Sequence, residues 1–388
     1  MFGPELKALC FRENHPLRLQ YAHFSQVAVC KLRKSSWIAQ FHGWQHICRA
    51  VINTDEVGFA MAKYLVTGAA GYIGQRLVHK LLLQGHKIVA VDAGPIESLE
   101  SLSDSSRGKL ELYRTDLSDK AWLSTAMAGV DLCFHLASKG NEEFQHYLPV
   151  ERQQEDHQVL FNGESFIDAL SQSLNVFEVA ARADNTPVIF PSCDSVYGPN
   201  ITYPLTENTC PMPISARGLY KYQVEQYARH FNLRYGLPVT ALRLFNVYGM
   251  WQDEWQGDVI SRFCQAVLNQ QPVTLFGNGE QERDFIHMDD VVQGFIKAGR
   301  AGFSGFNVFN LCTSEGTSLN RLLDIISSLQ GRPMQRNYEP HRSGDLNSAI
   351  GCNLKAQRQI SFRAEIPIAE GLRQVLKEAG AITLQKAV

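Results

Sequence analysis

The chain of 388 residues lacks several features that would point to a membrane, a nucleic acid or a metal ion. No apolar run approaches the ~18–20 residues that a membrane-spanning helix needs. The net charge of −2 gives no electrostatic reason to expect binding to nucleic acid or to a membrane surface. The nine cysteines form neither a CxxC pair nor a Cys/His cluster at zinc-ligand spacing. We therefore predict no metal site, no nucleic-acid partner and no membrane partner.

The composition is that of an ordinary globular protein, with 45% hydrophobic and 20% charged residues. The length accommodates two domains, or one large α/β domain with a smaller lobe. An odd number of scattered cysteines is typical of buried thiols in a reducing compartment. The sequence therefore predicts a cytoplasmic location.

Residues 1–60 differ from the rest because they show neither helical nor strand periodicity. Residues 1–50 hold seven Lys or Arg against two acidic residues. A targeting peptide can be basic in this way, but the compact apolar core of a signal peptide is missing. Because Met61 directly precedes a strong strand pattern, we expect the functional protein to begin near Met61. Residues 1–60 are then a poorly ordered N-terminal extension, and a transit peptide is the alternative.

From Met61 onward, short apolar runs alternate with segments of helical spacing. The expected strands cover residues 63–68, 87–92, 110–116, 130–138, 186–192 and 237–246. This alternation predicts βαβ units, and hence an α/β fold with a Rossmann-type, doubly wound, mostly parallel sheet covered on both faces. After Gly249 the expected strands become shorter and mix with helices at 258–269 and 317–329, which predicts a smaller C-terminal α/β lobe.

We predict the following division. A dinucleotide-binding domain spans 61–247 plus about 287–312, and a substrate-binding lobe spans 248–286 plus 313–388.

The stretch TGAAGYIG at residues 67–74 lies between the first expected strand and the first expected helix. Glycines at 68, 71 and 74 permit a tight turn and the close approach of a pyrophosphate to N–H groups at the helix N-terminus. Asp92 closes the second strand about 20 residues further on, where a carboxylate accepts bonds from ribose hydroxyls. It also favours NAD over NADP, although nearby Arg76 leaves that choice open. The predicted cofactor-binding residues here are Gly68, Gly71, Tyr72, Ile73, Gly74 and Asp92.

The Gly-x-x-Gly-x-x-Gly spacing resembles the extended short-chain dehydrogenase/reductase family of NAD-dependent nucleotide-sugar epimerases and dehydratases. Five further stretches match that family in order: Asp116-Leu117, FHLAS at 134–138, LRLFNVYG at 242–249, GNGEQERDFIHMDDVV at 277–292 and PHRSGD at 340–345. By this resemblance Asp116 and Leu117 contact the adenine, and Ala137 belongs to the strand-4 cofactor motif.

The resemblance also implies three residues that hold the diphosphate of a nucleotide sugar: Asn246, Arg283 and Arg342. Arginine suits this role because its guanidinium binds phosphate oxygens in a bidentate manner. The alternative is that the arginines form ordinary surface ion pairs, Arg283 with Asp284 or Asp289 and Arg342 with Asp345.

Family members oxidise a sugar hydroxyl with a Ser or Thr, a tyrosine, and a lysine four residues after the tyrosine. Lys221 matches the lysine, which implies a contact with the nicotinamide ribose, but Arg217 stands at the tyrosine position. Cys193 stands at the Ser/Thr position, and Ala169 aligns with a helix-4 asparagine. A guanidinium does not lose its proton in proteins, so Arg217 cannot act as a base.

Asp194 matches an acid that family dehydratases use to protonate a leaving hydroxyl, although their following glutamate is Ser195 here. The candidate catalytic residues are therefore Lys221, Cys193, Asp194 and Arg217. For Cys193 and Arg217 the alternatives remain a buried structural thiol and a surface helix arginine.

The leading hypothesis is an NAD-dependent nucleotide-sugar epimerase or dehydratase that acts through a keto sugar with altered acid/base residues. The first alternative is a non-catalytic protein that binds NAD or a nucleotide sugar. The second is a sugar reductase that releases the cofactor as a cosubstrate. The resemblance also implies a homodimer formed through two long helices, one of which bears Lys221.

Overall fold

The computed structural model describes residues 61–106, 108–138, 163–200, 202–249, 259–341 and 348–380. These residues belong to one unit, Gly58–Val388. The prediction made for residues 1–60 lies outside the described residues.

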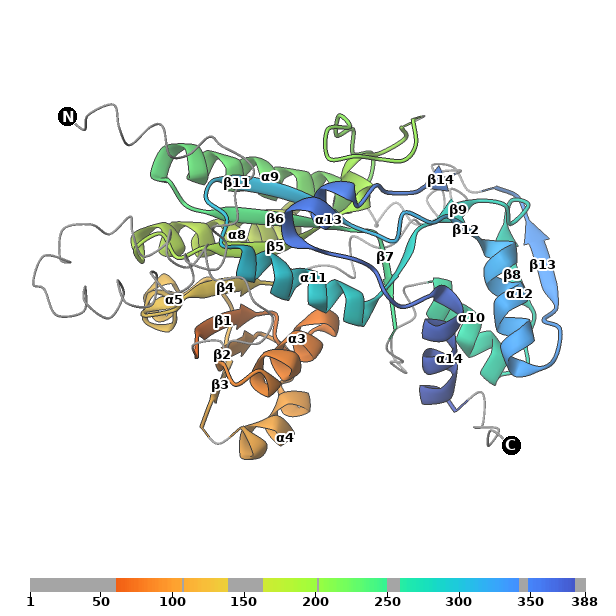
Figure 1. Cartoon of the computed structure of the whole chain (residues 1–388), viewed down its shortest axis with the longest axis horizontal. Helices are drawn as coiled ribbons and strands as arrows, with labels where there is room; N and C mark the ends of the chain where they lie inside the picture. The colour runs from red at the N-terminus through yellow and green to blue at the C-terminus, as the bar shows by residue number, and fades with distance from the viewer. Residues whose placement is uncertain are drawn as a thin grey trace, which may run out of the picture. The chain divides into compact units, whose positions relative to one another are not determined.

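Seven parallel strands form the central sheet, in the order β11-β6-β5-β4-β1-β2-β3 (Figure 1). Their bounds are β1 Lys63–Thr67, β2 Lys87–Asp92, β3 Leu110–Arg114, β4 Leu132–His135, β5 Val188–Cys193, β6 Val239–Leu244 and β11 Phe306–Leu311. The six strands expected up to residue 246 are all present, and the doubly wound fold class is confirmed. The expected run at 237–246 is divided between β6 and a short strand β7, Asn246–Tyr248.

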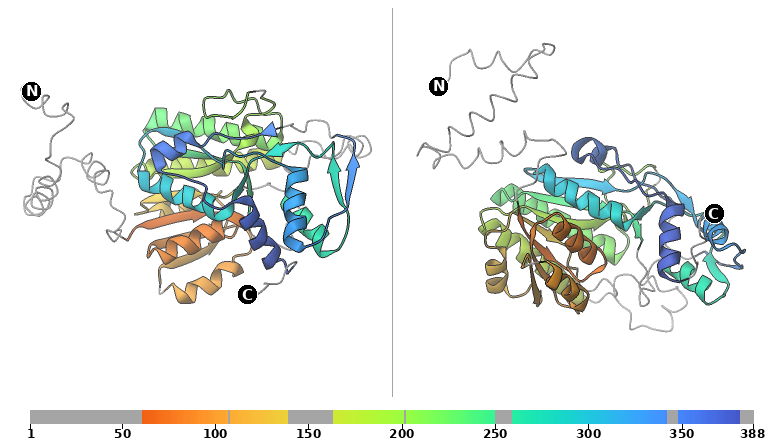
Figure 2. Two further views of the ribbon diagram at one scale, coloured as in Figure 1. Left: turned by 45° about the vertical axis from the view of Figure 1, so that its right-hand side comes forward. Right: turned by 60° about the horizontal axis from the view of Figure 1, so that its bottom comes forward.

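Helices cover both faces of this sheet because alternate strand residues point to opposite sides. In β1, for example, Val66 packs with the helices of one face and Leu65 with those of the other. The first face carries α3 Tyr72–Leu83, α4 Glu97–Ser105, α11 Met288–Ala301 and α13 Leu354–Ile360. The second face carries α5 Lys120–Met127, α8 Gly163–Arg182 and α9 Ala216–Tyr235. The two views in Figure 2 show both helix layers.

A separate apolar cluster forms from later parts of the chain. Its helices are α10 Val259–Leu268, α12 Leu319–Gln330 and α14 Ile368–Glu378, and strands β8 Val273–Phe276 and β13 Arg336–Glu339 lie beside them. Short strands β9 Glu282–Arg283, β10 Phe285–His287, β12 Thr317–Ser318 and β14 Ser348–Ala349 complete the small sheets. Helix α13 packs against α11 and β11 instead, although the predicted division assigned its residues to the lobe.

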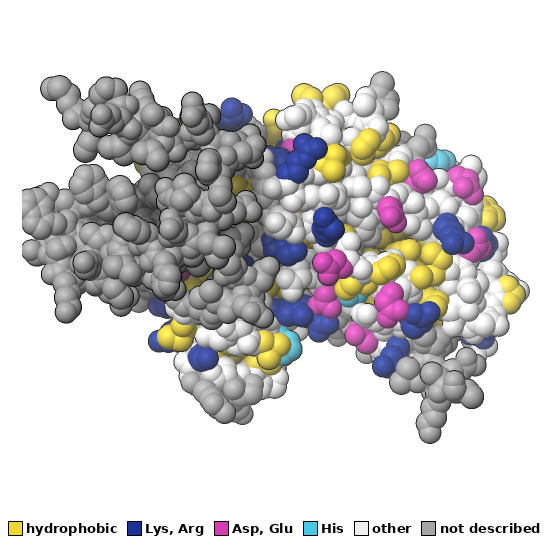
Figure 3. All heavy atoms as spheres, in the orientation of Figure 1, with side chains coloured by type: hydrophobic (Ala, Val, Ile, Leu, Met, Phe, Trp, Pro, Cys, Tyr) yellow, Lys and Arg dark blue, Asp and Glu magenta, His cyan; other side chains and the backbone are white. Residues whose placement is uncertain are grey.

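The strand order reverses between β1 and β4, which are neighbours in the sheet. In such sheets ligands bind in the crevice outside the carboxyl ends of the strands, near this reversal. Acidic and basic side chains are interspersed on the visible face of the described part (Figure 3). Among the described helices, none is long and apolar enough to cross a membrane.

Candidate functional site

The passage from β1 into the first turn of α3 can be built only with glycine at two positions. Gly68 has φ of +66°, and a Cβ there would lie 2.5 Å from the backbone nitrogen of Ala137. A Cβ on Gly74 would lie 2.1 Å from the carbonyl oxygen of Gly68. Helix α3 begins after Gly71 with no side-chain cap and no acidic residue in its first turn. Its N-terminal N–H groups are therefore available to an anion such as a pyrophosphate.

Asp92, at the end of β2, also shapes this loop. Its Oδ2 accepts a hydrogen bond from the Ala70 backbone N–H at 2.9 Å, and its Oδ1 accepts one from that of Gly94 at 2.9 Å. Each carboxylate oxygen can accept further bonds, so a ribose hydroxyl can still be received. Arg76 points elsewhere, because its guanidinium pairs with Asp289 of α11 at 2.9 Å.

The remaining predicted cofactor residues lie at the same edge of the sheet. Asp116 follows β3, and its Oδ1 accepts a hydrogen bond from the Ser118 backbone N–H at 2.9 Å. Leu117 is buried in the core under α5 and α8. Ala137 follows β4, where its N–H donates to the Thr67 hydroxyl at 3.3 Å. Tyr72 and Ile73 are half-buried in the first turn of α3.

A chain of buried polar side chains, absent from the sequence predictions, runs from this edge to α9. The Thr67 Oγ1 lies 2.8 Å from His135 Nδ1, and His135 Nε2 lies 3.1 Å from the hydroxyl of Ser173 on α8. That hydroxyl lies 3.2 Å from the Tyr220 hydroxyl. Burial lowers the pKa of His135 to about 3, and the charge of Lys221 adds to the effect. The imidazole is therefore neutral at physiological pH, and the phenol of Tyr220 points into the core.

Cys193 and Asp194 mark the carboxyl end of β5 and the start of the short 3-10 helix η3, Asp194–Val196. Cys193 is 1% exposed, and burial raises the pKa of its thiol despite the nearby charges of Arg217 and Lys221. Burial also raises the pKa of the Asp194 carboxyl, and the charges of Arg217 and Arg283 act against this increase. Its Oδ1 accepts a hydrogen bond from the Ser195 hydroxyl at 3.3 Å.

Helix α9 brings Lys221 and Arg217 to this strand end. The Ser215 hydroxyl caps the helix by accepting from the Gly218 N–H at 3.0 Å. A Cβ on Gly218 would lie 2.4 Å from the Ser195 carbonyl oxygen, so only glycine allows this approach to η3. Lys221 is 7% exposed, and its pKa is lowered to about 8 by burial and by the charge of Arg217. The Nε of Arg217 is buried without a hydrogen-bond partner in the described structure.

One turn after Lys221, a buried ion pair that the sequence reasoning missed fixes α9 to the sheet. Glu225 is 1% exposed and accepts two hydrogen bonds from Arg243 of β6, at 2.9 and 2.7 Å. The hydroxyl of Ser192, next to Cys193, also donates to Glu225 at 2.5 Å. An arginine within an otherwise apolar strand was the only sequence signal for this pair.

The predicted diphosphate residues lie in or beside the lobe. Asn246 begins β7, and its Nδ2 donates to the Asp284 carbonyl oxygen at 3.3 Å. Arg283 on β9 donates to the Glu282 carbonyl oxygen at 2.8 Å, and its charge reaches Asp194 across the site. The alternative ion pairs for Arg283 are not formed. Asp284 accepts instead from Thr313, Ser314 and Gly351, and Asp289 pairs with Arg76. Arg342 and its alternative partner Asp345 lie outside the described residues.

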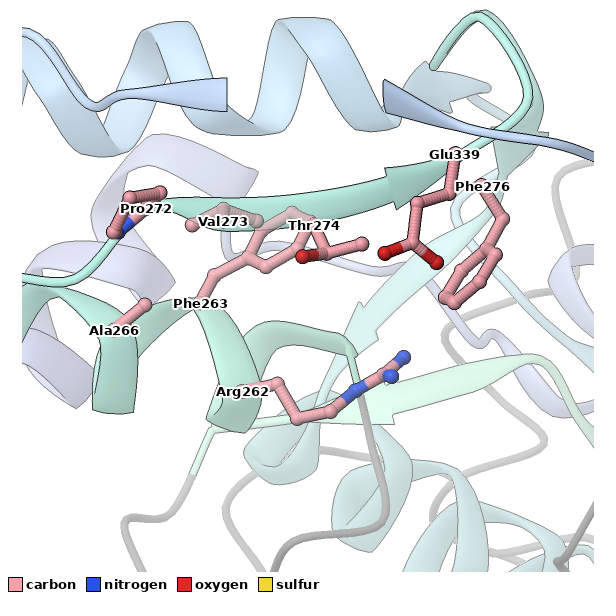
Figure 4. A pocket seen from close by; sticks show the side chains of 8 residues that line it. All are labelled: Arg262, Phe263, Ala266, Pro272, Val273, Thr274, Phe276 and Glu339. Carbon is pink, nitrogen blue, oxygen red and sulfur yellow. The ribbon is translucent and has the colours of Figure 1, made fainter. Parts of the chain in front are cut away.

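A pocket of about 390 Å³ lies in the lobe between α10 and the β8–β13 pair, and none of the predicted site residues line it. Figure 4 shows Arg262 and Glu339 on opposite sides of this space, with Phe276 beside Glu339. The Gln281 side chain donates to the Phe276 carbonyl oxygen at 2.8 Å, so the pocket is tied to the segment that carries Arg283. Within the described ranges, no group of three or more His, Cys, Asp or Glu side chains could hold a metal ion.

Comparison with known proteins places these features in one family. The NAD dependent epimerase/dehydratase family matches residues 64–312. A UDP-glucose 4-epimerase from Mycolicibacterium smegmatis is 30% identical, over 81% of this chain and 97% of the relative.

Two solved structures resemble the chain over nearly their full lengths. A UDP-N-acetylglucosamine 4-epimerase from Methanobrevibacter ruminantium, in complex with UDP-N-acetylmuramic acid, is 29% identical with a TM-score of 0.70 and covers 82% of this chain and 98% of its own. MoeE5, in complex with UDP-glucuronic acid and NAD, is 29% identical with a TM-score of 0.69 and covers 82% and 99%. The glycine loop, the parallel sheet and these matches agree, and the chain belongs to the NAD-dependent epimerase/dehydratase family.

Proposed function

We propose that this protein is an NAD-dependent nucleotide-sugar epimerase or dehydratase that acts through a keto sugar with an altered set of acid/base residues. The observation that carries the proposal is the position of Lys221. It lies buried at the carboxyl end of β5, beside Cys193 and Arg217. On the lobe side, the charge of Arg283 reaches the adjacent Asp194. Relatives named as UDP-sugar epimerases support this substrate class.

The cofactor is assigned to the edge formed by the ends of β1 to β5. The α3 N-terminus and the glycine loop receive the pyrophosphate, and Asp92 receives the adenosine ribose. Asp116, Leu117 and Ala137 border the adenine side and the strand-4 end. The Arg76–Asp289 pair supports NAD over NADP, because this guanidinium is already engaged away from Asp92. Lys221 is assigned to the nicotinamide ribose.

The substrate is assigned to the lobe side of the same crevice. Arg283 and Asn246, together with the predicted Arg342, hold the diphosphate. The pocket beside Phe276 takes the nucleobase, whose flat ring can stack on that phenyl group. Gln281 links Phe276 to the Arg283 segment, which gives the two subsites a fixed separation.

Bound NAD would supply the hydride chemistry for oxidation of the sugar hydroxyl and for the later reduction. The protein must accept the hydroxyl proton during that oxidation. Lys221, with a pKa of about 8, is able to exchange a proton near neutral pH. Cys193 is less suited to act as a base, because burial holds its thiol in the neutral form. Asp194 is suited to act as an acid, because burial raises its pKa.

The experiment incubates the full chain with NAD and UDP-, dTDP-, GDP- and CDP-sugars in deuterated water, and proton NMR follows the anomeric signals. New anomeric signals, or deuterium next to a keto carbon, support the proposal. Unchanged sugars with a rise in melting temperature on adding NAD support the non-catalytic alternative, which the arginine at position 217 favours. A stoichiometric change in nicotinamide absorbance supports a reductase that releases its cofactor.

A homodimer through α8 and α9 is a further part of this proposal. Both helices expose large apolar side chains: Ile167 on α8, and Leu219, Tyr227, Leu233 and Tyr235 on α9. Such residues along two adjacent helices fit a self-complementary interface. Sedimentation that finds only monomer at micromolar concentration rejects it.

A further inference from the structure

The end of β5 carries more positive than negative charge. Lys221 and Arg217 approach it from α9, and the charge of Arg283 reaches it from the lobe. Asp194, at the start of η3, is a carboxylate that lies among these cations. In the described structure, neither Arg217 nor Arg283 forms an ion pair with Asp194, which would require a nitrogen–oxygen distance of at most 4.0 Å. The site is therefore suited to receive anionic groups.

Arg217 has unused hydrogen-bonding capacity. Its Nε is buried and lacks a hydrogen-bond acceptor in the described structure. The adjacent Ser215 hydroxyl is occupied in capping the helix, and the first turn of α9 has no acidic residue. Gly218 packs closely against the Ser195 backbone, so this turn of α9 lies next to the strand end. A buried guanidinium N–H without an acceptor is unfavourable, so a ligand that supplies one is expected to bind well.

We propose that Arg217 binds a carboxylate on the sugar ring, so that the substrate is a nucleotide-linked uronic acid or a similar acidic sugar. This inference rests on the proposed function, which assigns the diphosphate to Arg283. Arg217 and Arg283 belong to different elements, α9 and β9, and the charges of both act on Asp194, so one substrate with two separated anionic groups can engage both. A carboxylate matches the planar, bidentate donor geometry of a guanidinium. A neutral hexose leaves Arg217 without an anion.

The test measures binding by calorimetry with the full chain saturated with NAD. UDP-glucuronate is compared with UDP-glucose, and UDP-galacturonate with UDP-galactose, because each pair differs only in the carboxylate. One charge-assisted hydrogen bond predicts that the uronates bind roughly tenfold to a hundredfold more tightly. Arg217→Gln is expected to remove this difference, because it should weaken binding of the uronates more than binding of the neutral sugars. Arg217→Lys keeps the positive charge but lacks the bidentate N–H geometry of a guanidinium. It is expected to retain part of the preference for uronates.

Arg283→Gln is the matched control, and it should weaken all four ligands by a similar factor. Neutral sugars that bind as tightly as the uronates overturn the inference and leave the proposed function standing. The inference is also overturned, and the proposed function left standing, if Arg217→Gln weakens binding of both members of each pair equally. Failure of all four ligands to bind rejects UDP-sugars as substrates and the inference with them. If Arg217→Gln does not fold, the Lys variant decides, because an undiminished uronate preference then excludes a bidentate contact.

Discussion

Replacing Glu225 is expected to destabilise the protein strongly, because it leaves the Arg243 charge buried without a partner. Arg243 is 4% exposed and Glu225 is 1% exposed. Glu225 accepts two hydrogen bonds from Arg243 and one from Ser192. The Arg243 Nη1 already lacks a hydrogen-bond partner in the described structure, and the Tyr197 ring, 4.7 Å from the guanidinium carbon, cannot neutralise its charge. Removing one partner of such a pair costs about 3–5 kcal/mol of unfolding free energy.

The assay is urea unfolding of the full chain, followed by circular dichroism. Glu225→Gln should lower the unfolding free energy by about 3 kcal/mol or more, since the amide removes the charge and replaces one acceptor with a donor. The double variant Glu225→Leu with Arg243→Met should recover most of the loss, because well-packed apolar residues often replace a buried pair at little cost.

Glu178 provides a matched control, since it also lies on a long helix and pairs with two cations, Lys120 and Arg182, each at 2.6 Å. The Glu178 side chain is 30% exposed and those of Lys120 and Arg182 are 48% and 76% exposed, so Glu178→Gln should cost no more than about 1 kcal/mol. Equal effects of Glu225→Gln and Glu178→Gln would refute the reasoning, because burial would then not determine the cost. A double variant less stable than Glu225→Gln alone would show that packing around Arg243, and not its charge, dominates.

Three further predictions concern the site. Arg217→Gln removes one of the two causes that lower the Lys221 pKa to about 8. The midpoint of a kcat–pH profile that depends on Lys221 should therefore move to higher pH. An unchanged midpoint contradicts this prediction. Gly74→Ala should abolish the rise in melting temperature on adding NAD, because the new Cβ would lie 2.1 Å from the Gly68 carbonyl oxygen. His135 has a pKa of about 3 in the folded protein, against 6.5 for an ordinary histidine in the unfolded chain. Its contribution to stability is therefore complete above pH 6.5 and is lost as pH falls towards 3. Between pH 6.5 and 5.0 the unfolding free energy lost in this way is at most about 2 kcal/mol. Over the same pH interval, His135→Gln should lose correspondingly less unfolding free energy, measured by urea unfolding.

The strands and the glycine loop could be predicted from the sequence because their signals are local. The run at 87–92 became β2 at those residues, and its four central residues are apolar and buried, as expected of a strand that is covered on both faces. Gly68 and Gly74 were predicted from spacing, and the structure gives the physical reason: a side chain at either position would collide with neighbouring backbone.

The contacts that assemble the site could not be predicted, because they join residues far apart in the chain. His135 lies between Thr67 and Ser173, which are 68 and 38 residues away. Glu225 and Arg243 are 18 residues apart and meet only because α9 covers β5 and β6. Polar residues in apolar segments signal that a partner exists, but the partner follows only from the topology.

Under the proposed mechanism, the arginine at position 217 changes which group on α9 can exchange a proton. The resemblance implies a titrating tyrosine with a lysine one turn later that lowers its pKa. Here the first position is permanently charged, and Arg217 contributes to lowering the pKa of Lys221 to about 8, so we propose that the lysine is the group that titrates. The residue that lowers the pKa, Arg217, thus precedes the residue that titrates, Lys221, whereas the order along the helix is the reverse in the family pattern. A substrate carboxylate on Arg217 would offset that charge and raise the pKa of Lys221. Binding of an acidic sugar is therefore expected to promote proton uptake at Lys221, which calorimetry in two buffers of different ionisation enthalpy would measure directly.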